Sequence, residues 1–385
     1  MNEWRLILNR IGGCTKKLLL HGLAEERAES IMSLNWKRLL GCSQDDVLGL
    51  DIGSSSVRMI QLTKNGGGYT VVAAHVCDIK RDNADAAARE ESIVQAVQKC
   101  MVFARKNARW AVCSVSGPEV AVRPFKFPPL QTEELDGAVR LEASQVCPFN
   151  VDEGVVDYQI IPSDESDNAA AGVLVAASND VIQRKIRIVE KANISCVMMD
   201  VDGLALLNCL NADKDTGINI STSPVLDIGT SCTTLAVMGE NGLPFVRTVP
   251  YAGNDIVEQI AKENNVSIKS VEDELYGSAS PTIAPENLQA SMERASIKLV
   301  SDVAETLRYH STQAKSAPVE QLLVCGTFGM VKGFVDILNK QLPIKVVLWN
   351  PFDTMKCSVD RQCLEVIQSK GPAMVVAAGL AMRSV

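Results

Sequence analysis

Two stretches of the chain place an aspartate, a glycine and hydroxyl side chains in the same order. Residues 50–55 read LDIGSS and residues 226–231 read LDIGTS. An aspartate at the end of an apolar strand projects its carboxylate beyond the sheet edge, where it can hold Mg²⁺, usually through water. Glycine lets a backbone approach a phosphate closely, and serine or threonine can donate hydrogen bonds to its oxygens. Each stretch therefore has the chemistry of a phosphate-binding hairpin.

One copy of this pattern would be weak, because an ordinary tight turn uses the same residue types. Two copies at the heads of similar strand runs indicate two related halves, whose hairpins could hold a polyphosphate from opposite sides of a cleft. We predict that Asp51 and Asp227 hold Mg²⁺ through water. The predicted phosphate contacts in the two hairpins are Gly53, Ser54, Ser55, Gly229, Thr230 and Ser231.

A third glycine-rich turn follows a later apolar run. Residues 325–329 read CGTFG and lie between an expected strand, 322–324, and an expected helix. A glycine at this position permits close approach of a purine ring and its ribose, although an ordinary strand-to-helix turn has a similar composition. The predicted nucleotide contacts in this turn are Gly326, Thr327, Phe328 and Gly329.

The elements that must position these turns alternate between short apolar strands and helices with apolar residues at helical spacing. Expected strands in the two related halves are 47–51, 57–62, 69–76 and 110–116, then 225–227, 233–237, 243–249 and 322–324. Between the halves, 118–200 is expected to be an inserted module with helices 132–146 and 180–191 and strands 155–161, 173–177 and 195–199. The other expected helices are 91–106, one from Asp255 capped by Asn254, 293–313 and 371–382, with 265–290 irregular.

Composition narrows the classes of function. The formal net charge of -8 disfavours nucleic-acid binding, which needs a basic surface. The 12 cysteines form no CxxC pair and only 3 histidines are present, which is typical of reduced thiols and not of a zinc site. No run of about 18 apolar residues occurs, so no membrane span is expected.

The first 47 residues have their own character, with basic side chains interleaved among Leu, Ile and Trp. A basic amphipathic helix on a membrane or partner and a loosely packed tail are both compatible with this pattern. Translation starting near Met32 is a further alternative.

Residues 49–58, GLDIGSSSVR, resemble the opening of the PilM family of type IV pilus assembly proteins, within the superfamily of actin, heat-shock chaperones and sugar kinases. The resemblance extends over residues 47–382 through segments such as FPPL at 127–130 and NPF at 350–352. It identifies 51–56 and 227–234 with the two phosphate loops and 326–329 with the adenosine motif. It also adds Ser56 and Arg58 to the nucleotide contacts, with Arg58 standing where a lysine is usual.

The resemblance implies an α/β protein of the actin-like, ribonuclease H-like ATPase fold, with two lobes and an inserted subdomain of the PilM or FtsA type. The implied division is an N-terminal extension 1–47, a first lobe 48–117, an inserted subdomain 118–200, a return to the first lobe 201–222, a second lobe 223–370 and a closing helix 371–385.

The function implied is that of a cytoplasmic adaptor at the inner face of the membrane. It would bind ATP with Mg²⁺ and contact the N-terminal cytoplasmic segment of PilN and the pilus motor machinery. Asp200 and Asp202 resemble the link between lobes, where chaperone ATPases place a water-orienting acid, but both could equally be helix N-caps. An FtsA-like polymer-forming protein, a small-molecule kinase and an adaptor that does not hydrolyse ATP remain alternatives, so enzyme status stays open.

Overall fold

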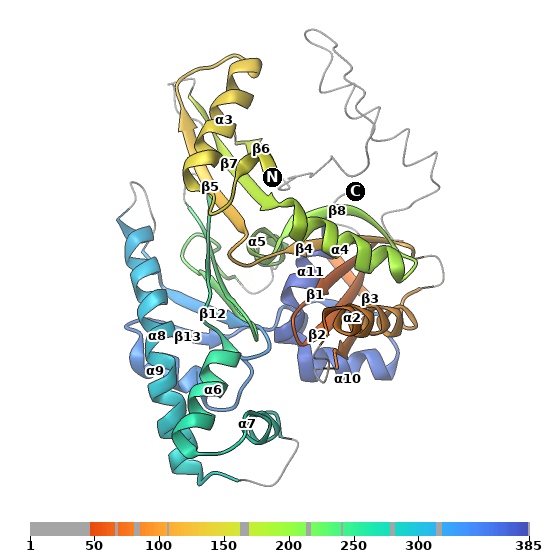
Figure 1. The fold of residues 1–385 in the computed structure, drawn as a ribbon, viewed down its shortest axis with the longest axis vertical. Helices are drawn as coiled ribbons and strands as arrows, with labels where there is room; N and C mark the ends of the chain where they lie inside the picture. Colours follow the sequence, from red (N-terminus) through yellow and green to blue (C-terminus); the bar gives the residue numbers. More distant parts are fainter. Residues whose placement is uncertain are drawn as a thin grey trace.

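The computed structural model describes residues 47–383 apart from 66–67, 81–84, 106–107, 162–168, 213–216, 240–241, 278–281 and 313–317. The predictions for residues 1–46, for the polar loop 163–168 and for most of the glycine turn at 66–68 lie outside the described residues. Two large sheets and one small sheet form the framework, with helices packed around them (Figure 1).

The first lobe is built on a six-stranded sheet in the order β14-β3-β2-β1-β4-β8. Its strands are β1 (Val47–Ile52), β2 (Ser56–Asn65), β3 (Gly68–Asp78), β4 (Trp110–Val115), β8 (Ser195–Val201) and β14 (Lys356–Cys357). The central strand β1 is buried along its whole length, as expected for a continuous apolar run with both faces covered.

The second lobe repeats this plan in a five-stranded sheet, β11-β10-β9-β12-β13. Its strands are β9 (Val225–Ile228), β10 (Thr233–Met238), β11 (Pro244–Val249), β12 (Gln321–Cys325) and β13 (Lys345–Leu348). In both sheets an antiparallel meander of three strands continues into parallel strands, so β9 in the second lobe corresponds to β1 in the first. The prediction of two related halves is confirmed.

Helices cover these sheets. Those packed with the first lobe are α2 (Ala86–Met101), α4 (Asn179–Lys191), α5 (Asp202–Ala212), α10 (Arg361–Lys370) and α11 (Val375–Ala381), and those of the second lobe are α6 (Gly253–Asn264), α7 (Ile268–Leu275), α8 (Pro285–Ser311) and α9 (Phe334–Gln341). One apolar cluster fills the first lobe and continues through α5 to second-lobe residues such as Ala236 and Leu323, whereas a second cluster lies wholly within the second lobe. Among the described residues, no helix is both long enough and apolar enough to cross a lipid bilayer.

The inserted module is smaller than the sequence predicted. Its sheet, β5-β7-β6, consists of β5 (Val120–Phe127), β6 (Gly154–Ile160) and β7 (Ala170–Ser178), and α3 (Thr132–Val146) packs on it. In contrast, β8 pairs in parallel with β4, and α4 buries Ile182 and Ile186 in the first-lobe core. Of the expected span 118–200, residues 179–200 therefore belong with the first lobe.

Four other local predictions differ from the structure. The helix expected at 91–106 is α2, which begins at Ala86 because the Asp85 carboxylate accepts the N–H of Ala87. Helix α6 begins at Gly253 and not after Asn254, since the Asp255 carboxylate accepts the Ala252 N–H. The span expected to be irregular, 265–290, holds α7 and the first turn of α8, and the closing helix opens as a 3-10 turn over residues 371–374.

Candidate functional site

The two predicted hairpins have the same local geometry and touch each other. The Gly53 N–H donates to the Ser56 carbonyl over 3.0 Å, and the Gly229 N–H donates to the Cys232 carbonyl over 3.1 Å. The hydroxyls of Ser54 and Thr230 are 2.5 Å apart, although 176 positions separate them in sequence. Thr230 also donates to the Ser55 hydroxyl over 3.3 Å. The first-lobe and second-lobe hairpins thus meet directly.

Arg58 joins these hairpins to the third predicted turn. It lies on β2 opposite Asp51 on β1, and its Nη1 donates to Asp51 Oδ2 over 2.6 Å. Its Nη2 donates to the Thr327 hydroxyl over 2.7 Å. Both charged side chains of the pair are buried, with 9% of each exposed. One guanidinium group therefore connects the first lobe to the glycine-rich turn of the second.

Three carboxylates influence one another around this guanidinium. Desolvation, followed by the charges of Asp202 and Asp51, raises the pKa of Asp227 to about 7. Desolvation and the charge of Asp51 likewise raise the pKa of Asp202 to about 6, while hydrogen bonds from serines oppose the rise. Burial opposes the charge of Arg58, but Asp51, Asp227 and Asp202 together raise the pKa of Arg58. The two predicted metal-binding aspartates therefore both lie within electrostatic reach of Arg58.

The two candidate catalytic aspartates occupy different surroundings. Asp202 is the first residue of α5, and the hydroxyls of Ser114 and Ser116 on the first lobe bond to its carboxylate. Asp200 lies on β8, is buried and accepts a hydrogen bond from Arg383 over 2.5 Å. Of the two, Asp202 is the one that belongs to the group of charges around Arg58.

The residues of the third turn lie in different surroundings. Gly326 has a φ of +89°, and a Cβ at this position would lie 2.3 Å from Asp227 Oδ1, so glycine is required where the turn passes the carboxylate. Gly329 makes a similarly close turn against the carbonyl of Cys325. Phe328 is fully buried in the second-lobe core and packs edge-on against Phe334. A nucleotide contact by Phe328, which the sequence predicts, would therefore involve its backbone and not its side chain.

Sequence reasoning missed two basic side chains beside the first hairpin. Lys185 of α4 donates to the carbonyl of Ile52, and Arg89 of α2 donates to the carbonyl of Ser54 over 3.1 Å. Both come from helices far from residues 51–56 in sequence, and no local pattern marks either of them. Ser231 is exposed and Ser56 is buried at the start of β2, so the predicted hydroxyls differ in accessibility.

The donors present fit a polyphosphate with a divalent cation. Within the described ranges, no three His, Cys, Asp or Glu side chains converge closely enough to ligate an ion directly. An ion at this place would be held by Asp51 and Asp227 through water and by phosphate oxygens. Ser54, Ser55 and Thr230 offer hydroxyls, and the buried Nε of Arg58 has no hydrogen-bond partner among the residues described.

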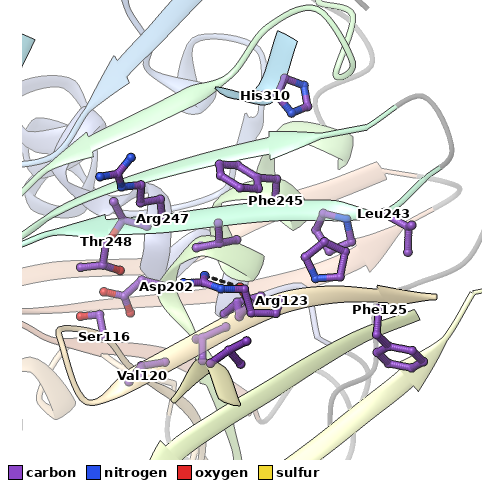
Figure 2. Close-up of a pocket in the computed structure, with 18 of the residues that line it drawn as sticks. Ser116, Val120, Arg123, Phe125, Asp202, Leu243, Phe245, Arg247, Thr248 and His310 are labelled. Carbon is purple, nitrogen blue, oxygen red and sulfur yellow. Dashed lines mark hydrogen bonds between the residues drawn. The ribbon is translucent and has the colours of Figure 1, made fainter. Parts of the chain in front are cut away.

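A cavity of about 960 Å³ opens next to this site. It lies between β5, an edge strand of the inserted module, and β11, an edge strand of the second lobe (Figure 2). Ser116 and Asp202 line one end, whereas Phe125 and Leu243 line the other (Figure 2). The buried Nε2 of His310, which also lines the cavity, has no hydrogen-bond partner among the described residues.

Comparison with known proteins identifies a matching family and several similar structures. A family model described as type IV pilus assembly protein PilM matches residues 49–385. The chain is similar to a structure named the PilM-PilN type IV pilus biogenesis complex, with 22% identity and a TM-score of 0.73 over 89% of this chain and 99% of that one. It also resembles a diol dehydratase-reactivating factor, with 11% identity and a TM-score of 0.51 over 87% and 98% of the two chains. A third similar structure is the archaeal actin homolog Ta0583, at 14% identity and a TM-score of 0.40 over 87% and 97%.

Proposed function

The chain belongs to the PilM family of type IV pilus assembly proteins, and we propose that it is an adaptor that binds ATP with Mg²⁺ between its two lobes. The observation that carries this proposal is the direct meeting of the two hairpins through Ser54 and Thr230. The hydroxyls that the two hairpins bring together suit the oxygens of a phosphate chain. Contacts to both lobes make the ligand favour one relative arrangement of the lobes over others.

Each side chain of the site has a role in this proposal. Ser54, Ser55 and Thr230 donate to phosphate oxygens, and Arg58 supplies positive charge next to them. Asp51 and Asp227 hold the waters around Mg²⁺, which when bound neutralises phosphate charge. Asp202 accepts a proton from, or orients, a water near the phosphate chain. The adenosine moiety lies against Gly326.

We assign the cavity between β5 and β11 to an extended peptide, the N-terminal cytoplasmic segment of PilN. Both bordering strands are sheet edges, and an edge strand can pair with an incoming extended chain through backbone hydrogen bonds. Phe125 and Leu243 give one end an apolar lining that suits aliphatic side chains. The protein would then lie at the cytoplasmic face of the inner membrane, held there through PilN.

Nucleotide binding is tested by calorimetry with Mg²⁺-ATP. The double variant Asp51→Ala/Asp227→Ala should lose at least about 10-fold in affinity, because both metal-holding carboxylates are gone. The matched control, Asp180→Ala/Asp336→Ala, removes one exposed aspartate from each lobe and the same number of carboxyl groups, and it should bind as the wild type does. Equal affinities for the two double variants would refute the nucleotide site.

Peptide binding is tested with a fluorescently labelled peptide that carries the N-terminal cytoplasmic segment of PilN. Phe245→Ser removes apolar surface from the cavity wall and should weaken binding by about 10-fold or more. Ile297→Ser is the control, because Ile297 is 59% exposed on α8 and does not line the cavity. Binding that Ile297→Ser weakens and Phe245→Ser leaves intact would place the peptide elsewhere.

A further inference from the structure

Arg58 makes two hydrogen bonds to different parts of the site. It neutralises Asp51 through Nη1 and reaches across to the other lobe through Nη2, which donates to Thr327. The residues joined by the second contact are 269 positions apart. The same guanidinium is thus both the counter-ion of a predicted metal-holding carboxylate and a direct bond between the lobes.

These contacts set Arg58 in competition with a cation. Asp51 Oδ2 accepts from the guanidinium over 2.6 Å in a buried pair, so this oxygen is already neutralised by a tethered charge. A buried carboxylate binds one positive charge strongly because water does not screen the interaction. A hydrated divalent ion that approaches Asp51 must therefore share or replace the guanidinium.

The space around Arg58 leaves the guanidinium little freedom. A Cβ at Gly53 would lie 2.9 Å from Arg58 Nη1, so the hairpin backbone passes directly beside the guanidinium. Asp227 and Asp202 add further negative potential at the same place. Arg58 thus already offsets negative charges that would attract a metal ion here.

We infer that Arg58 determines how the nucleotide site takes up a divalent cation. It competes with the cation for Asp51, and it also bonds the two lobes through Thr327. The site then has low affinity for a free divalent ion, and an ion enters together with the phosphate chain, whose oxygens give Arg58 a new partner. The inference rests on the proposed nucleotide site, and it assigns Arg58 a role that the usual lysine would fill differently. A lysine has one compact charged group and cannot present two parallel donors to Asp51 and Thr327.

The test uses Mn²⁺ alone as the probe and the full chain without nucleotide, with free Mn²⁺ counted by electron paramagnetic resonance. Arg58→Met should bind Mn²⁺ about 10-fold more tightly than the wild type, because Asp51 loses its counter-ion. Adding Asp51→Asn to that variant should abolish the gain. Equal Mn²⁺ affinity in the wild type and Arg58→Met would overturn the inference.

The contact between lobes is tested separately with Thr327→Val, which keeps the Asp51 pair and removes the acceptor. Mn²⁺ affinity should stay at the wild-type value, whereas amide hydrogen exchange of residues 229–232 and 326–329 should become faster. Unchanged exchange would show that the Thr327 contact does not hold the lobes together.

One further variant and one parallel measurement keep the test decisive if Arg58→Met does not fold. Arg58→Lys preserves the charge and should reproduce the faster exchange of Thr327→Val with little gain in Mn²⁺ affinity. A large gain in Arg58→Lys would contradict competition by charge. Mg²⁺-ATP affinity is measured in parallel, so failure of nucleotide binding with an intact Mn²⁺ effect would reject the proposed function and leave the competition standing.

Discussion

Arg383 donates from Nε to Asp200 Oδ2 over 2.5 Å, although the two residues are 183 positions apart. Both side chains are nearly inaccessible, with 3% of Arg383 and none of Asp200 exposed. The pair fastens the residues after α11 to β8 in the first lobe. Asp200 and Asp202 therefore differ in their contacts, because Asp200 pairs with Arg383 whereas Asp202 faces the hairpins.

The Asp200–Arg383 pair predicts a large loss of stability when one partner is removed. Asp200→Asn or Arg383→Met should lower the free energy of unfolding by about 3–5 kcal/mol, because each change leaves a buried charge without its counter-ion. Urea unfolding measures this loss. The double variant should recover part of it, and additive losses in the double variant would contradict a direct coupling.

For Asp202 we predict an effect on ATP hydrolysis. Asp202→Asn should lower the rate of ATP hydrolysis by about 100-fold, because an amide cannot accept a proton from water. Since the pKa of Asp202 is raised to about 6 in the free protein, the wild-type kcat/KM should rise with pH through that value. Asp180→Asn, an exposed change on α4, is the control. A rate in Asp202→Asn equal to that of the wild type would exclude Asp202 from the reaction.

Asp227 predicts a pH-dependent stability. The pKa of Asp227 is raised to about 7 in the folded protein, against about 3.9 in an unfolded chain. Between these values the folded state binds more protons than the unfolded state, so this group lowers stability as pH rises from about 4 to 7. Asp227→Asn should therefore raise Tm by roughly 2–4 °C at pH 8 and change it little near pH 4.

The measurement for Asp227→Asn is thermal unfolding in chelator without nucleotide, with the exposed Asp336→Asn as control. A Tm difference that is largest at low pH would reverse the sign and show that Asp227 is ionised and stabilised in the fold.

Two helical glycines predict effects of opposite sign. A Cβ at Gly379 in α11 would lie 1.8 Å from the carbonyl oxygen of Ala205 in α5, so Gly379→Ala must push the two helices apart. We expect a loss of about 1–3 kcal/mol or more. A Cβ at Gly137 in α3 would meet nothing within 4 Å, so Gly137→Ala should stabilise by about 0.5–1 kcal/mol. Chemical denaturation compares the two variants, and similar effects of both would refute the close helix contact.

Much of the fold follows from local sequence. The apolar runs and turns that define the two meanders predict their strands to within a few residues, because burial of a strand and the conformation of a tight turn depend on neighbours in the chain. The repeated LDIG pattern likewise predicts two equivalent hairpins. By contrast, β5 escaped prediction because Pro124 weakens a strand pattern, and the structure accommodates this residue by making β5 a sheet edge.

Only the tertiary structure decided how the hairpin side chains are used. The contacts Ser54–Thr230, Arg58–Thr327 and Asp200–Arg383 join residues 176, 269 and 183 positions apart. Phe328 was predicted at the site by its place in a glycine-rich turn, but its side chain is buried in the second-lobe core. Sequence pattern fixes which residues end each strand, whereas the packing of lobe against lobe determines the direction in which each side chain points and the charge that it meets.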